Sequence, residues 1–206
     1  MTVLSSMPYP RRARSRHLRA AVPAATTTTI APMPAAQLLN YGLHLESATL
    51  DSSDDRGAFG VVGQVALASA ALAAWRMRRR LRRWGPACVA LPVLLTFLTL
   101  DKVLRLHDHI AAWRLYYAPM LLVIVIALVT VARHLPAPTA RLIHVGLILL
   151  IVAFGVHLAG HAVLDRLGFT ADSWAEQIKA VTKHGAEVAG WLLVALALAL
   201  APVTRR

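Results

Sequence analysis

Apolar residues gather along this chain into five runs of helical length, separated by short polar segments. The runs are 57–75, 86–100, 116–132, 142–164 and 188–203. A helix needs about 20 apolar residues to cross the hydrocarbon core of a bilayer. The second run is too short alone, so we expect it to continue through Leu106 and to carry Asp101 into or beside the membrane. Five helix-length runs are also too few for a closed barrel. The pattern predicts an all-α, polytopic transmembrane helix bundle of about five spans.

Positive charges between the apolar runs predict how the spans are oriented. Six arginines fall within 76–83, and we expect this segment to form a cytoplasmic loop. Alternation then places the basic segment 133–141 and the tail at Arg205 and Arg206 on the same side. The predicted topology has the N-terminus outside and the C-terminus inside. We expect the protein in the cell membrane, that is, the inner or plasma membrane.

The first part of the chain has a different composition from the rest. Residues 1–56 carry clustered arginines, a run of four threonines and several prolines, so we predict a disordered or amphipathic N-terminal segment. Residues 57–206 form the predicted transmembrane bundle. A re-entrant or amphipathic helix around 35–50 is one alternative for the N-terminal segment, and a start of translation at Met33 is another.

Composition excludes several classes of protein. The chain of 206 residues is 57% hydrophobic, with a mean hydropathy of +0.57, which is too apolar for an ordinary soluble domain. Its net charge of +12 could suggest nucleic acid, but the arginine run lacks interleaved aromatic residues. We therefore predict a lipid bilayer as partner and no nucleic acid. The single cysteine, Cys88, permits neither an internal disulfide nor a thiolate metal site.

Ionisable residues inside the apolar runs gather at one depth, near the outer face of the predicted bundle. They come from the second, fourth and fifth spans. Burying such groups in a membrane is costly, so a cluster of them is by default a functional-site hypothesis. The members are Asp101, His107, Asp108, His109, His157, His161, Asp165, His184 and Glu187.

Helical spacing gives the fourth and fifth spans one polar face each. His157 and His161 are four residues apart, with Asp165 four further on, so the three side chains point the same way. Two histidines at this spacing can ligate one metal ion. In the fifth span, His184 and Glu187 share a face.

The second span adds a face that depends on where its helix ends. If the helix continues, Asp101, Arg105 and Asp108 share a face, His107 lies roughly opposite and His109 beside it. Asp101 and Arg105 could then form an ordinary i,i+4 pair.

Three functions are compatible with this cluster. The first is a membrane-embedded hydrolase, with a zinc-like divalent metal held by His157 and His161 together with His107, His109 or His184. A carboxylate from Asp101, Asp108 or Glu187 would act as general base, on a lipid or small-molecule substrate. The second function is haem-based electron transfer, with histidines of different helices as axial ligands. The third is a non-enzymatic assembly or proton-relay role. The sequence leaves enzyme status and oligomeric state open.

Two resemblances rest on short motifs. The stretch 97–101, continuing to Leu106, His107 and Asp108, resembles the "LD…LHE" signature of uncharacterised actinobacterial multi-pass membrane proteins, although Asp108 stands where those proteins usually carry Glu. The stretch 183–191 resembles their last helix, and the similarity covers roughly 86–202. It implies a membrane location and no established activity. The HxxxH motif with an Asp/His pair is also similar to ceramidase-like transmembrane hydrolases, which are zinc enzymes with seven spans and another motif order.

Overall fold

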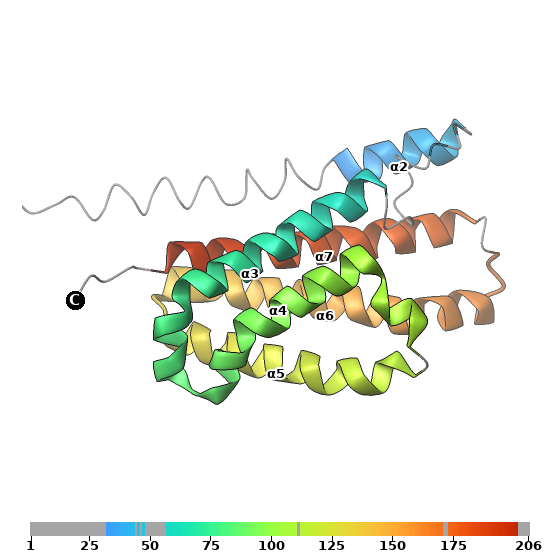
Figure 1. Cartoon of the computed structure of the whole chain (residues 1–206). Coiled ribbons are helices and arrows are strands. Elements are labelled where there is room, and N and C mark those ends of the chain that lie inside the picture. Colours follow the sequence, from blue (N-terminus) through green and yellow to red (C-terminus); the bar gives the residue numbers. More distant parts are fainter. Residues whose placement is uncertain are drawn as a thin grey trace, which may run out of the picture.

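The computed structural model describes residues 32–43, 45, 47, 57–110, 112–170 and 173–201, and shows a helical bundle (Figure 1). No strand occurs in these described ranges, so the predicted all-α class is confirmed. Most of the predicted N-terminal segment lies outside the described residues. The helices are α2 (Pro32–Gly42), α3 (Ala58–Trp84), α4 (Pro86–Leu104), α5 (Trp113–Arg133), α6 (Ala137–Arg166) and α7 (Trp174–Leu200), with a short 3-10 helix, η1 (Leu106–His109), after α4.

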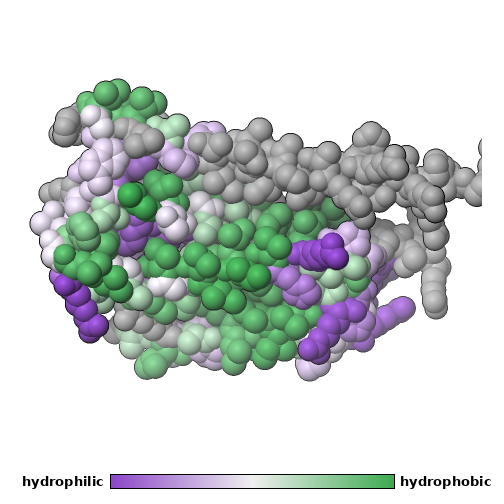
Figure 2. All heavy atoms as spheres, turned by 180° about the vertical axis from the view of Figure 1, so that it is seen from behind, coloured by the Kyte–Doolittle hydropathy of each residue, from purple (hydrophilic) through white to green (hydrophobic). Residues whose placement is uncertain are grey.

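The helices α3 to α7 are each long and apolar enough to cross a membrane, as the five runs predicted. The chain is thus a multi-pass membrane protein whose partner is the lipid bilayer. Figure 2 shows hydrophobic side chains across the middle of one face, with hydrophilic side chains gathered toward both ends of the bundle. This distribution matches an apolar membrane core between two polar interfaces.

The arginine-rich segment is helical, which corrects the predicted loop. α3 runs without interruption through Arg76–Arg83 to Trp84, because arginine is a good helix former and nothing in the segment breaks the helix. Gly85 alone joins α3 to α4, with φ +122°, a conformation that L side chains rarely adopt. Pro86 then occupies the first turn of α4.

The second span also ends earlier than predicted. α4 stops at Leu104, and Arg105 takes a left-handed conformation (φ 55°, ψ 40°) while its backbone N–H donates to the Asp101 carbonyl oxygen. The chain then reverses into η1. This reversal changes which side chains meet Asp101.

Two close helix contacts fix the bundle around α7. Gly146 of α6 and Gly190 of α7 meet backbone to backbone, because a Cβ on Gly190 would stand 2.9 Å from the Gly146 carbonyl oxygen. On the other side of α7, Gly63 of α3 faces Val188. α3 is in turn tied to α4 by the bond from Trp75 Nε1 to the Thr96 hydroxyl oxygen, 3.0 Å long.

The last span begins well before the apolar run from which it was predicted. Ser173 caps α7 by accepting a hydrogen bond from the Glu176 backbone N–H, as the capping-box pattern indicates. α2 packs against these first turns of α7. Gln37 hydrogen-bonds to Gln177, and Tyr41 packs edge-on against Trp174. Residues 32–42 thus form a helix that packs on the bundle. This helix overlaps the range 35–50, in which a re-entrant or amphipathic helix was one alternative.

An apolar pocket with a charged end

A cavity of about 450 Å³ lies between α4, α5, α6 and α7. Most of its wall is aliphatic or aromatic, and the polar side chains come mainly from the ends of α4 and α5 and the middle of α6 and α7. The apolar wall includes Leu98, Leu121, Leu122, Val125, Leu147, Leu150, Ile151, Phe154 and Trp191. The ionisable lining groups are Asp101, Lys102, His107, His157, Lys183 and Glu187, beside Trp113 and Tyr117.

Asp101 and His107 form the first part of the charged end. Asp101 is 5% exposed, and its Oδ1 accepts a hydrogen bond of 2.8 Å from the His107 backbone N–H. The His107 ring also turns toward this carboxylate, with Nδ1 3.1 Å from Oδ2. The left-handed Arg105 produces both contacts, because it folds η1 back over the last turn of α4. The buried Asp101 carboxylate is therefore paired with His107, which the chain reversal after α4 brings next to it.

Lys102 and Glu187 form the second part. The Lys102 ammonium nitrogen lies 2.5 Å from Glu187 Oε1, and the two side chains are 15% and 20% exposed. The Lys102 stem reaches α7 by passing Gly63 of α3, where a Cβ would stand 3.7 Å from Lys102 Cε. A methyl group at this position would therefore make only ordinary van der Waals contact with the lysine. This ion pair links α4 to α7 across 85 residues of sequence.

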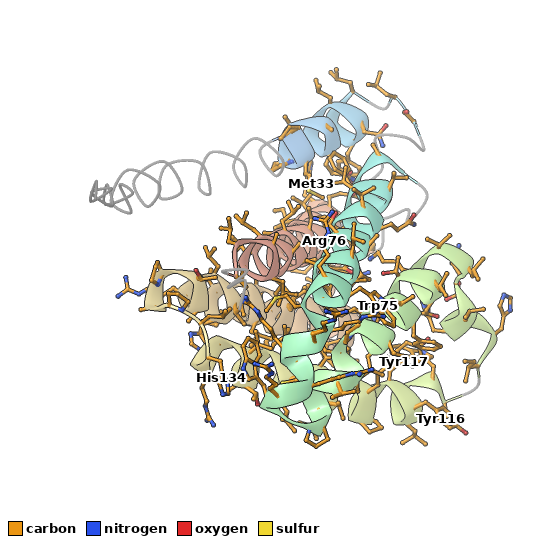
Figure 3. The ribbon with its side chains drawn as sticks, turned by 60° about the vertical axis from the view of Figure 1, so that its left-hand side comes forward. Met33, Trp75, Arg76, Tyr116, Tyr117 and His134 are labelled. Atoms are coloured by element: carbon orange, nitrogen blue, oxygen red, sulfur yellow. The ribbon has the colours of Figure 1, made fainter. Side chains whose placement is uncertain are left out.

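Aromatic side chains connect the two histidines of the pocket. Trp113 packs against the His107 ring, with centroids 5.8 Å apart, and against the His157 ring at 6.0 Å. Tyr117 lies one turn further along α5 and contacts both Trp113 and His107. In Figure 3, Tyr117 lies on the side of α5 toward the bundle, whereas its neighbour Tyr116 points away. The exposed fractions are 7% for Tyr117 and 67% for Tyr116.

The structure brings four of the predicted site residues to this pocket: Asp101, His107, His157 and Glu187. His184 and Asp108 lie outside it. His184 is 3% exposed and lies 4.0 Å from Glu187 through its Nδ1, but it does not line the pocket. Asp108 is exposed, outside the pocket.

Two predicted relations in the second span are wrong. Asp101 does not pair with the Arg105 side chain, whose Nε lies 2.6 Å from Asp108 Oδ2. His107 does not lie opposite Asp101 but beside it. Both differences arise because the helix ends at Leu104, so the helical spacing assumed for Arg105–Asp108 does not apply.

The described residues do not fit a zinc-like ion. They contain no group of three His, Cys, Asp or Glu side chains arranged to hold a metal. His107 illustrates the reason: its Nδ1 faces Asp101 and its Nε2 lies 3.3 Å from Asp108 Oδ1, so carboxylates occupy both ring nitrogens. Among the described side chains, His107, His157 and His184 are not brought together as a metal-binding set. The His161 side chain lies outside the described residues.

Sequence reasoning missed several residues of the charged end. Lys183 lines the pocket, although a lysine near the end of a span is usually solvated or near lipid headgroups. Lys102, Trp113 and Tyr117 line it as well, and none of them belongs to the predicted cluster. The helical periodicity of α5 could have grouped Trp113 with Tyr117, which are four residues apart.

Comparison with known proteins shows the family but no activity. The chain belongs to a family described as a domain of unknown function (DUF8692), which matches residues 20–201. No curated protein and no solved structure matches the chain.

Proposed function

We propose that this protein binds an amphiphile, a lipid or a lipid-soluble small molecule, in the pocket between α4, α5, α6 and α7, within the cell membrane. The hydrocarbon part would lie along the apolar wall, and the head would lie at the charged end. The observation that carries the proposal is the continuity of these two regions in one cavity. Ligand sites are typically cavities of about 300–1,000 Å³ with apolar walls and few convergent polar groups.

The lining side chains support a ligand that enters from the bilayer. Leu122 of α5 and Ile151 of α6 both line the pocket, and they are 60% and 61% exposed. In a membrane, such side chains face lipid, so the apolar part of the cavity adjoins the acyl chains. A hydrocarbon ligand could therefore move from the bilayer into the pocket without crossing water.

The charged end supports a role in holding the head of the ligand. Asp101 and Glu187 are each paired within the protein, so the carboxylates keep fixed positions beside the apolar chamber. Charged groups in a membrane interior are expensive, and their retention at one end of a cavity is typical of a functional site. A metal-dependent hydrolase is not proposed, because the described ligand geometry does not support one.

The test uses a brominated amphiphile as a quencher of tryptophan fluorescence. Trp113 and Trp191 line the pocket, so a bound brominated chain would quench them on contact. The purified protein in detergent is titrated with methyl dibromostearate, and saturable quenching is expected.

Two alanine-to-phenylalanine substitutions test whether the ligand binds in this pocket. Ala118 lines the pocket, so Ala118→Phe should fill part of the chamber and weaken binding at least about tenfold. Ala162 of α6 is exposed and lies outside the pocket lining, so Ala162→Phe is the matched control and should bind as the unmodified protein does. Quenching that is not saturable, or that Ala118→Phe leaves unchanged, would refute the proposed function.

A further inference from the structure

One hydroxyl at the charged end of the pocket lacks a partner. Tyr117 is 7% exposed, and within the described part of the chain its Oη finds no hydrogen-bond partner. The Asp101 carboxylate lies near enough to interact with this hydroxyl, but no hydrogen bond between the two groups has normal geometry. Buried polar groups in native structures are nearly always hydrogen-bonded, and each exception requires an explanation.

The neighbours of this hydroxyl have already formed their own bonds. Asp101 accepts from the His107 backbone and faces its ring, while Lys102 is bound to Glu187. Tyr117 lines the cavity, and its buried O–H donor finds no acceptor with good geometry among the described residues. An acceptor supplied by a ligand would remove the penalty of leaving this donor unpaired.

The charges around the hydroxyl indicate what kind of acceptor fits. The pocket lining contains two carboxylates, Asp101 and Glu187, and two amines, Lys102 and Lys183, so the formal charges of these four groups cancel. An anionic head at Tyr117 would lie near the Asp101 carboxylate and meet like-charge repulsion. A neutral oxygen acceptor meets no such repulsion.

We infer that the pocket selects a neutral amphiphile whose head carries a carbonyl or ester oxygen, and that Tyr117 Oη donates a hydrogen bond to this oxygen. The inference rests on the proposed function and names the ligand class of the same pocket. Tyr117 is then the residue that distinguishes an oxygen-bearing head from a plain hydrocarbon. Discrimination of this kind is strong because a mismatched ligand leaves the buried donor unpaired.

Three brominated probes with similar chains test this assignment by tryptophan quenching. They are methyl dibromostearate, which has a neutral ester head; dibromostearate, which is anionic under the alkaline conditions chosen; and dibromooctadecane, which has no head. Each is titrated against the full chain in detergent. The variants are Tyr117→Phe and the adjacent control Tyr116→Phe, which removes a hydroxyl from the exposed side of the same helix.

The ester should bind the unmodified protein most tightly. Tyr117→Phe should raise the ester Kd about fivefold, the effect of one neutral hydrogen bond, and should leave the hydrocarbon Kd unchanged. Tyr116→Phe should leave every Kd unchanged. If the ester binds saturably and Ala118→Phe weakens it, but Tyr117→Phe has no effect or the anion binds more tightly than the ester, this inference fails and the proposed function stands. If no probe binds saturably, both fail.

Discussion

Neutralising one partner of the Lys102–Glu187 ion pair should destabilise the bundle markedly. The pair is 2.5 Å long, largely buried, and joins two helices that are distant in sequence. Glu187→Gln leaves the Lys102 ammonium without its ion-pair partner. Lys102→Met likewise leaves the Glu187 carboxylate without its ion-pair partner. Each single substitution therefore strands a charge in a low-dielectric site, whereas the double substitution removes both charges.

The expected magnitude follows from burial. Removing one partner of a fully buried pair costs about 3–5 kcal/mol. The Lys102 and Glu187 side chains retain 15% and 20% exposure, so partial solvation reduces the expected loss to about 2 kcal/mol for each single variant. The double variant should lose only about 1 kcal/mol, because no uncompensated charge remains. The coupling free energy between the two positions is then about 3 kcal/mol.

Equilibrium unfolding in mixed micelles, with rising SDS mole fraction and tryptophan fluorescence as readout, measures these free energies. The control is Arg105→Gln, which breaks the Arg105–Asp108 pair. That pair is nearly as short, at 2.6 Å, but its side chains are 44% and 37% exposed, so its loss should cost no more than about 0.5 kcal/mol. Additive losses in the Lys102/Glu187 cycle, or equal losses for the two pairs, would refute the reasoning.

Two further substitutions test the packing of α6 and α7 and the state of the pocket tyrosine. Gly190→Ala should cost about 2 kcal/mol in the same unfolding assay, because the new methyl would stand 2.9 Å from the Gly146 carbonyl oxygen. The control Gly155→Ala, whose new methyl would meet no atom within 4 Å, should be neutral or slightly stabilising. Equal losses for the two variants would contradict the close crossing of α6 and α7. Tyr117→Phe without ligand should change the unfolding free energy by less than about 0.5 kcal/mol, since no described partner is lost, whereas a loss above about 1.5 kcal/mol would place its hydroxyl on Asp101.

The spans were predictable from sequence because each apolar run has helical length. Their ends were less predictable. Hydropathy assigned Arg76–Arg83 to a loop, although arginine favours a helix, because a window of charges conveys polarity and not backbone conformation. α7 likewise begins at Trp174, well before its apolar run, since the capped polar turns are stabilised by contacts with α2.

The pocket was predictable only in outline. Depth arguments drew attention to Asp101, His157 and Glu187, which the structure places around one cavity. The partners within that cavity depend on the left-handed conformation of Arg105, which is rare for a residue other than glycine and has no sequence signal. The direction of Lys102 depends on its ion pair with Glu187 of α7, a tertiary contact that one sequence does not reveal.

The single-residue connection between α3 and α4 has a mechanical consequence for the pocket. Because the arginines belong to a continuous helix and Gly85 alone follows it, α4 cannot slide along the membrane normal without moving the basic segment too. Contacts between those arginines and headgroup phosphates would therefore fix the position of α4 along the membrane normal. Fifteen residues of helix separate Pro86 from Asp101, a rise of about 22 Å, so with Pro86 at one surface the carboxylate would lie in the opposite leaflet of a core about 30 Å thick. A thinner or thicker bilayer would then shift the polar end of the cavity relative to the opposite surface.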